Sequence, residues 1–183
     1  MTKPRIHILG GPGIGKSFVA GELSRRLSVP AYDLDDLFWD RRAARYSVRA
    51  NPDERDQRLA AIVTQNGWVI EGVYYGWLAP SFDAADVIVE LSPFIWVRHW
   101  RVMRRFARRK FRRNPSKHES VLDLWRLLRW SHAYDARYLA EARESISACG
   151  RQVVACTTPE QVFAAASNFS SQRPAPRVAR RRR

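Results

Sequence analysis

The residues best suited to chemistry lie near the start of the chain, where the sequence GGPGIGKS at residues 10–17 follows the apolar run IHIL at residues 6–9. The spacing G-x-x-x-x-G-K-S is the Walker A pattern of phosphate-binding loops. Glycines let the backbone wrap closely around an anion, so that successive N–H groups point at phosphate oxygens. The pattern therefore predicts that the Lys16 ammonium contacts the terminal phosphates of a nucleotide and that the Ser17 hydroxyl binds Mg²⁺.

The residues around this motif support the same interpretation. An apolar run precedes it, and Val19, Leu23 and Leu27 recur every four residues after it, which is typical of an amphipathic helix. The start of such a helix adds the positive end of its dipole to the phosphate site. A glycine-rich turn without a ligand is the alternative interpretation, but it requires neither the strand nor the helix. The residues predicted to bind the nucleotide are Gly11, Pro12, Gly13, Ile14, Gly15, Lys16, Ser17 and Phe18.

The rest of the chain alternates apolar runs with segments of helical length and period. The runs suited to buried strands are residues 5–9, 29–32, 67–71, 86–91 and 152–156. Strands that alternate with helices form βαβ units, which build a parallel sheet covered by helices on both faces. We therefore expect an α/β protein with the three-layer sandwich of P-loop NTPases and a five-stranded parallel sheet. Ligands of such sheets bind outside the carboxyl ends of the strands.

Other segments mark helices and the limits of the domain. The sequence NPDE at residues 51–54 combines an N-cap, a proline in the first turn and acidic residues, which indicates a helix start. Residues 119–148 are predicted to form one long helix or a broken pair. Residues 170–183 are rich in Ser, Pro and Arg and are predicted to be disordered, because they lack apolar residues to pack. The predicted domain spans residues 1–169, followed by a basic tail at residues 170–183.

Acidic residues follow two of the predicted strands. Glu71 ends the apolar run at residues 67–71, where a Walker B carboxylate that holds Mg²⁺ would lie, close to the acceptor. Asp33 and Asp35 point to the same side if the extended conformation continues past residue 32. Asp33 is then predicted to assist Mg²⁺, and Asp35 to accept a proton from an attacking hydroxyl. The alternatives are an ordinary surface glutamate at position 71 and helix capping by Asp33 or Asp36.

The charge of the chain is strongly basic, with 32 Lys and Arg against 18 Asp and Glu and a formal net charge of +14. The excess is concentrated at residues 98–113 and in the tail. Residues 98–118 suit a lid whose arginines stabilise a transferring phosphoryl group, with Arg105 and Arg108 as candidates. A solvated helix face and a nucleic-acid-binding surface are the other two interpretations.

The composition also bears on location. No stretch approaches the about 20 apolar residues that a membrane span needs, and the N-terminus lacks the apolar core of a signal peptide. We therefore expect a cytoplasmic protein without a membrane partner. Cys149 and Cys156 fit no zinc pattern and no useful disulfide framework, so buried free thiols are expected.

Taken together, the motifs resemble those of the adenylate-kinase-like P-loop kinases, and among these the small bacterial group called DNA topology modulation proteins. The segments that carry the resemblance are residues 7–17, residues 34–39 (LDDLFW), residues 68–72 (WVIEG), the Arg-rich segment after Pro93 and the final strand with its Thr-Pro-Glu turn. The resemblance implies ATP and Mg²⁺ as cofactors, a lid after the fourth strand, and contact of Thr157 and Pro159 with the nucleotide base.

Aromatic residues gather near the predicted acceptor side. Core packing explains most of them, but Phe38 and Trp39 follow the aspartates and are candidates to flank a planar substrate, with Tyr74 nearby. The sequence thus predicts a Mg-ATP-dependent phosphotransferase that acts on a small hydroxyl compound, nucleoside or nucleotide. Two alternatives stay open: a P-loop ATPase that binds nucleic acid through its basic lid and tail, and a nucleotide-binding regulatory protein without efficient turnover.

Overall fold

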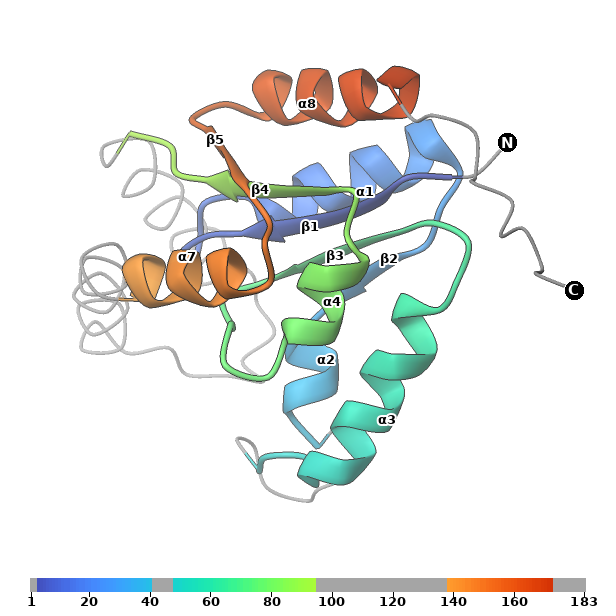
Figure 1. Ribbon diagram of the computed structural model, residues 1–183, viewed down its shortest axis with the longest axis vertical. Coiled ribbons are helices and arrows are strands. Elements are labelled where there is room, and N and C mark those ends of the chain that lie inside the picture. The colour runs from blue at the N-terminus through green and yellow to red at the C-terminus, as the bar shows by residue number, and fades with distance from the viewer. Residues whose placement is uncertain (1–2, 41–47, 95–137, 173–183) are drawn as a thin grey trace, which may run out of the picture.

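A computed structural model describes residues 3–40, 48–94 and 138–172. Its centre is a parallel sheet of five strands with the spatial order β2-β3-β1-β4-β5 (Figure 1). The strands are β1 (Arg5–Leu9), β2 (Ala31–Asp33), β3 (Trp68–Gly72), β4 (Val87–Leu91) and β5 (Val153–Cys156). Each is close to one of the predicted apolar runs, and the predicted five-stranded parallel sheet is therefore confirmed.

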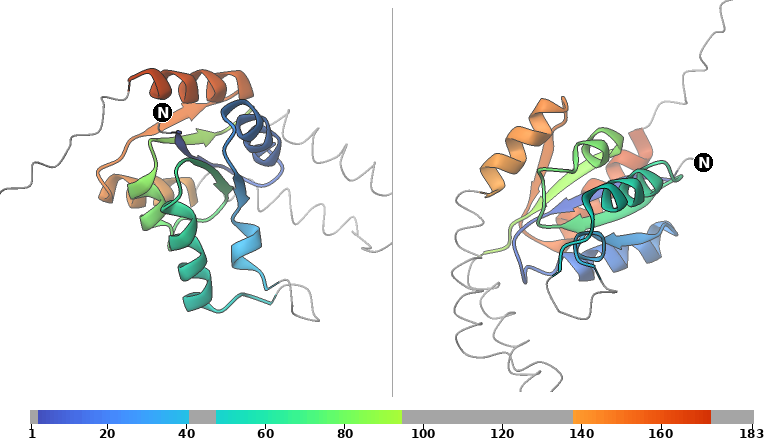
Figure 2. Two further views of the ribbon diagram at one scale, coloured as in Figure 1. Left: turned by 90° about the vertical axis from the view of Figure 1, so that its right-hand side faces the viewer. Right: turned by 90° about the horizontal axis from the view of Figure 1, so that it is seen from below.

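Helices cover both faces of this sheet. One face packs against α1 (Lys16–Leu27) and α8 (Pro159–Gln172), and the other against α3 (Pro52–Val63), α4 (Ala79–Ala84) and α7 (Leu139–Ala148) (Figures 1 and 2). The short helix α2 (Asp35–Phe38) continues from the end of β2. The molecule is thus a three-layer α/β sandwich, as predicted.

Two apolar clusters fill the spaces between the layers, because successive strand residues point to opposite faces. Ile6 and Ile8 of β1 join the cluster beneath α1 and α8, to which Val19 and Leu23 of α1 also belong. Leu9 joins the cluster on the opposite face. The periodic apolar residues after the phosphate-binding motif therefore face the core, as the sequence predicts.

The cap of α3 agrees with its sequence. Asn51 Oδ1 accepts a hydrogen bond of 2.8 Å from the backbone N–H of Asp53, and Pro52 occupies the first turn. This arrangement satisfies one of the backbone donors that a helix start leaves without an intrahelical partner.

Helix α8 continues to Gln172, three residues beyond the predicted domain boundary at residue 169. Residues 160–172 contain no glycine or proline, the two residues least favourable inside a helix. The rest of the tail, the lid region at residues 98–118 and the first part of the predicted helix at 119–148 lie outside the described residues. Within the described residues, no helix combines the length and apolarity needed to cross a membrane.

Candidate nucleotide and acceptor site

The phosphate-binding motif forms the loop between β1 and α1. Gly13 and Gly15 have φ angles of 75° and 99°, in the left-handed region that side chains rarely adopt. At Gly10, a Cβ atom would lie 2.2 Å from Ile14 Cδ1 and 2.5 Å from the carbonyl oxygen of Leu91. The glycines of the motif thus meet backbone requirements of the folded loop.

Lys16 begins α1 with a buried side chain, 7% exposed. Its Nζ donates a hydrogen bond of 3.0 Å to the Gly11 carbonyl and lies 4.0 Å from Glu71 Oε2. The ammonium is therefore held between the phosphate loop and the end of β3. This position suits the predicted contact with the terminal phosphates.

Glu71 lies at the end of β3 and is 3% exposed. Burial raises the pKa of its carboxyl group, while the Lys16 charge and a hydrogen bond with Ser17 act in the opposite direction. Its Oε1 atom is buried and has no hydrogen-bond partner among the residues that the structure describes. A buried carboxylate oxygen without a partner beside a serine hydroxyl suits a hard cation that takes oxygen ligands.

Asp33, the third residue predicted to bind the metal, pairs with Glu71 in the β2–β3 register. Burial raises the pKa of the Asp33 carboxyl group. The charges of the neighbouring aspartates act in the same direction, and the Lys16 charge acts in the opposite one. The structure thus brings Ser17, Glu71 and Asp33 to the same strand ends. Within the described ranges, no group of three or more His, Cys, Asp and Glu side chains has metal-binding geometry.

The extended conformation ends at Asp33, so the condition under which Asp33 and Asp35 would point to the same side is not met. Leu34 is helical, with φ −65° and ψ −21°, and Asp33 Oδ1 accepts a hydrogen bond of 2.9 Å from the backbone N–H of Asp35. Aspartate side chains favour this turn because they can bond the backbone two residues ahead. Asp33 and Asp35 are therefore not alternate residues of one strand. Asp33 ends β2, and Asp35 begins α2, whose N-cap residue is Leu34 rather than one of the aspartates proposed for capping.

Asp35 nevertheless faces the aromatic residues expected on the acceptor side. The Tyr74 hydroxyl donates a hydrogen bond of 2.7 Å to Asp35 Oδ1. The Tyr74 ring stacks on Phe38 with centroids 4.4 Å apart, and Trp39 meets Phe38 edge-on at 4.8 Å. The Arg49 guanidinium lies 5.5 Å from the Phe38 ring centroid. Phe38 therefore has ring partners within the protein, in agreement with the packing alternative, and its contact with a substrate stays a prediction.

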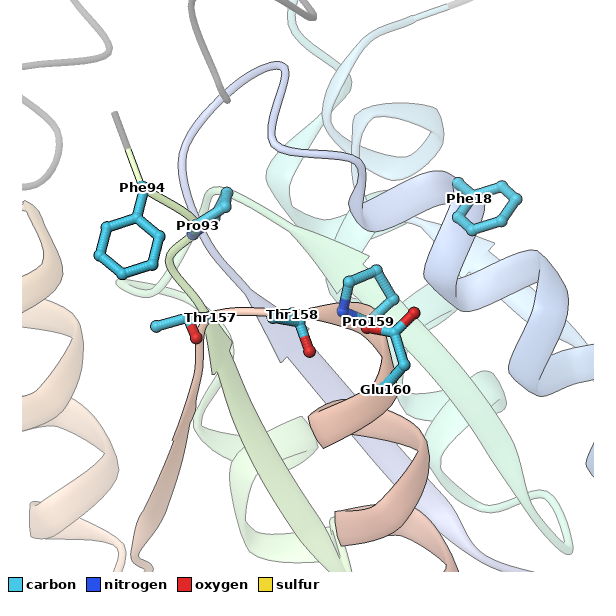
Figure 3. A pocket seen from close by; sticks show the side chains of 7 residues that line it. All are labelled: Phe18, Pro93, Phe94, Thr157, Thr158, Pro159 and Glu160. Carbon is cyan, nitrogen blue, oxygen red and sulfur yellow. The ribbon is translucent and has the colours of Figure 1, made fainter. Parts of the chain in front are cut away.

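A pocket of about 440 Å³ opens at the other half of the sheet edge (Figure 3). Phe18 of α1 and Phe94 after β4 lie at opposite ends of this view, with the turn from β5 to α8 between them. The side chains that line the pocket are Phe18, Pro93, Phe94, Thr157, Thr158, Pro159 and Glu160. The structure thus brings together three predicted nucleotide-binding residues from distant parts of the chain: Phe18, Thr157 and Pro159.

The sequence interpretation missed the contribution of Phe94 to this pocket. Phe18 and Phe94 are 70% and 73% exposed, which is unusual for large apolar side chains. The signal available in the sequence was the place of Pro93 and Phe94 directly after a strand, where ligands of parallel sheets bind. The predicted lid residues Arg105 and Arg108 lie outside the described residues.

The strand order decides how these parts are arranged. The phosphate loop follows β1, the middle strand of the sheet. Asp33, Asp35 and Glu71 lie at the ends of β2 and β3 on one side of it, and the pocket lies at the ends of β4 and β5 on the other. A nucleotide whose phosphates occupy the loop would therefore have space for its base on one side and carboxylates on the other.

Comparison with known proteins extends this description. No family model matches the chain. The chain is 28% identical over 141 residues to YqaC, an uncharacterized protein of Bacillus subtilis, an alignment that covers 73% of this chain and 74% of YqaC.

Solved structures with the same architecture include two kinases. A gluconokinase from Sinorhizobium meliloti has a TM-score of 0.53 and 19% identity, and each chain is covered to 93%. A shikimate kinase from Bacteroides thetaiotaomicron has a TM-score of 0.53 and 16% identity, with 92% of this chain and 96% of that one covered. An uncharacterized protein from Eubacterium ventriosum has a TM-score of 0.55 and 14% identity, with 93% of this chain and 99% of that one covered. The chain therefore has the α/β fold of the P-loop kinases.

Proposed function

We propose that this protein is a Mg-ATP-dependent phosphotransferase that transfers the γ-phosphoryl group to the hydroxyl of a small-molecule acceptor. The observation that carries the proposal is the order of features along the sheet edge. The phosphate loop lies between a pocket lined by aromatic residues and the carboxylate group at the ends of β2 and β3. The base, phosphates and acceptor of a kinase reaction need such a sequence of sites.

The described residues take separate roles in the proposed phosphoryl transfer. The loop N–H groups and the Lys16 ammonium bind and neutralise the phosphates, and the start of α1 adds its dipole. Asp35 orients the acceptor hydroxyl and takes its proton at Oδ2, the carboxylate oxygen that Tyr74 leaves open. The pocket between Phe18 and Phe94 holds the base by apolar contact.

Mg²⁺ would be held by the Ser17 hydroxyl and by Glu71, with Asp33 beside them. When bound, the ion would neutralise charge on the phosphate oxygens. Glu71 suits this role because its Oε1 is buried without a hydrogen-bond partner among the described residues. The closing arginine of the reaction is assigned to the lid region, with Arg105 and Arg108 as the candidates from their spacing and from the family resemblance.

The acceptor is proposed to be a small hydroxyl compound, a nucleoside or a nucleotide. The gluconokinase and the shikimate kinase with the same fold support the first class. The resemblance to the DNA topology modulation proteins adds no acceptor chemistry of its own. We place the reaction in the cytoplasm, where ATP and Mg²⁺ are available.

A nucleic-acid-stimulated ATPase is the second candidate, favoured by the net charge of +14. Basic surfaces bind nucleic acid without sequence preference, so binding alone does not distinguish the two functions. Stimulation of ATP turnover by DNA distinguishes the two functions, because only the second candidate predicts it.

The test is ADP release by the full chain with Mg-ATP, in the presence of pooled nucleosides, nucleotides, small polyols and sugar acids, and separately with DNA. Acceptor-dependent release that is lost in Lys16→Ala and Asp35→Asn supports the kinase. Asp36→Asn is the matched control, because it makes the same change one residue away and is expected to retain turnover. Turnover that responds only to DNA would replace the kinase with the second candidate.

A further inference from the structure

We propose that Tyr74 is a positioning residue for phosphoryl transfer, which holds the Asp35 carboxylate through its hydroxyl so that Oδ2 faces the acceptor. This role rests on the proposed kinase function. It differs from substrate contact, because Tyr74 acts on the acceptor through Asp35.

The hydrogen bond between the two residues has a defined direction. The Tyr74 hydroxyl lies 2.7 Å from Asp35 Oδ1. Burial, together with the bond to Asp35, raises the pKa of the Tyr74 phenol, so the phenol keeps its proton. A carboxylate oxygen only accepts, so the Tyr74 hydroxyl donates its proton to Asp35.

The ring of Tyr74 is fixed independently of its hydroxyl. It stacks on Phe38 at 4.4 Å with an interplanar angle of 26°, and it lies 6.0 Å from the Trp77 ring. Phe38 and Asp35 are three residues apart on α2, so they lie on one face of that helix. Tyr74 thus contacts α2 at both positions, and the stacked ring sets where the hydroxyl points.

Tyr74 also connects Asp35 to the end of β3. Glu71 precedes Tyr74 by three residues, and its carbonyl accepts a hydrogen bond of 2.9 Å from the backbone N–H of Leu34. Leu34 is adjacent to Asp35. Two hydrogen bonds therefore link the segment of Glu71, proposed for the metal, to the segment of Asp35, proposed for the acceptor. One is the backbone bond of Leu34, and the other is the Tyr74–Asp35 bond.

If Tyr74 only packed against α2, removal of its hydroxyl would not affect the reaction through Asp35. Exposed carboxylates have two oxygens of equal chemistry and a side chain that rotates. One charge-assisted bond to Oδ1 fixes that rotation and leaves Oδ2, which accepts no bond from the described residues. Tyr74→Phe keeps the ring that stacks on Phe38 and removes the hydroxyl that donates to Asp35.

The experiment compares Tyr74→Phe with Tyr75→Phe in the full chain. The Tyr75 hydroxyl donates to Glu141 of α7, so the second variant makes the same chemical change on the next residue. We expect Tyr74→Phe to lower the acceptor-dependent kcat by about tenfold, as for the loss of a bond to a charged group. The KM for ATP stays unchanged, and Tyr75→Phe stays near wild type.

A double-mutant cycle with Asp35→Ala separates positioning from packing. If Tyr74 acts through Asp35, adding Tyr74→Phe to Asp35→Ala leaves the residual single-turnover rate of the Asp35→Ala variant unchanged. Equal effects of Tyr74→Phe in both backgrounds, or a kcat within about twofold of wild type for the folded single variant, overturn the positioning role. Absence of acceptor-dependent turnover in the wild-type chain is a different result, since it overturns the kinase function itself and this role with it.

Discussion

Gly72 lies so close to Leu34 that a Cβ atom on the glycine would be 2.7 Å from Leu34 Cδ1 and 2.8 Å from Leu34 Cβ. Leu34 is fully buried and immediately precedes Asp35. The end of β3 and the start of α2 are therefore packed without room for a methyl group between them. A small residue at position 72 is a condition for the position of Asp35.

Gly72→Ala is expected to push Leu34 away and to move α2. Overpacking of this kind costs about 1–3 kcal/mol of the free energy of unfolding, and acceptor-dependent turnover should fall together with stability. Urea unfolding and ADP release measure the two effects. Gly76→Ala is the control from the same connection, because its Cβ atom would meet nothing within 4 Å. A Gly72→Ala variant as stable and active as wild type would contradict the packing argument.

Gly21 offers the opposite change in α1. It lies inside the helix on an exposed position, and a Cβ atom there has no neighbour within 4 Å. Alanine loses less conformational freedom on folding than glycine does. Gly21→Ala is therefore expected to raise the free energy of unfolding by about 0.5–1 kcal/mol. The expected result is a higher urea midpoint with unchanged turnover. A lower midpoint would contradict the prediction, because it would mean that the added methyl group meets a neighbour.

His7 makes the stability of the fold depend on pH. It is fully buried in β1, and its Nδ1 lies 2.7 Å from Ser81 Oγ. Desolvation by burial lowers its pKa from 6.5 to about 3, so between these values the unfolded chain binds more protons than the folded one. Stability is then full above pH 6.5 and falls as the pH decreases. The loss from this residue by pH 5 is about 2 kcal/mol.

The measurement for His7 is the free energy of unfolding of wild type and His7→Gln between pH 8 and pH 5. The glutamine variant is less stable at neutral pH but should lack this part of the slope. Parallel curves for the two proteins would show that His7 does not carry the effect.

Phe18 and Phe94, in the pocket that we propose holds the nucleotide base, give a prediction for nucleotide binding. Phe94→Ala removes apolar area next to the proposed base and should weaken ATP binding by about tenfold, or about 1.4 kcal/mol. Binding of inorganic triphosphate should not change, because the phosphate loop is intact. Titration calorimetry with both ligands tests this difference. Equal weakening of both would place Phe94 in the phosphate site instead.

The local features of this protein follow from its amino-acid sequence alone. The Walker A spacing predicted the loop, because positive φ angles at Gly13 and Gly15 are a local backbone demand that only glycine meets easily. Apolar periodicity predicted α1 and all five strands, since burial repeats with the period of each element. The strand ends at Asp33, whose side chain accepts a hydrogen bond from the Asp35 N–H, so Asp33 and Asp35 do not share one side of an extended segment.

Which of these features come into contact depends on the packing of the folded domain. Nothing in the local pattern states that β1 lies between β3 and β4, because strand pairing depends on packing of the whole chain. That order placed Phe18 and Phe94 on one pocket and brought Tyr74 to Asp35, 39 residues away in sequence. Contacts between distant residues follow from which elements share a sheet edge, and that is a property of the folded domain.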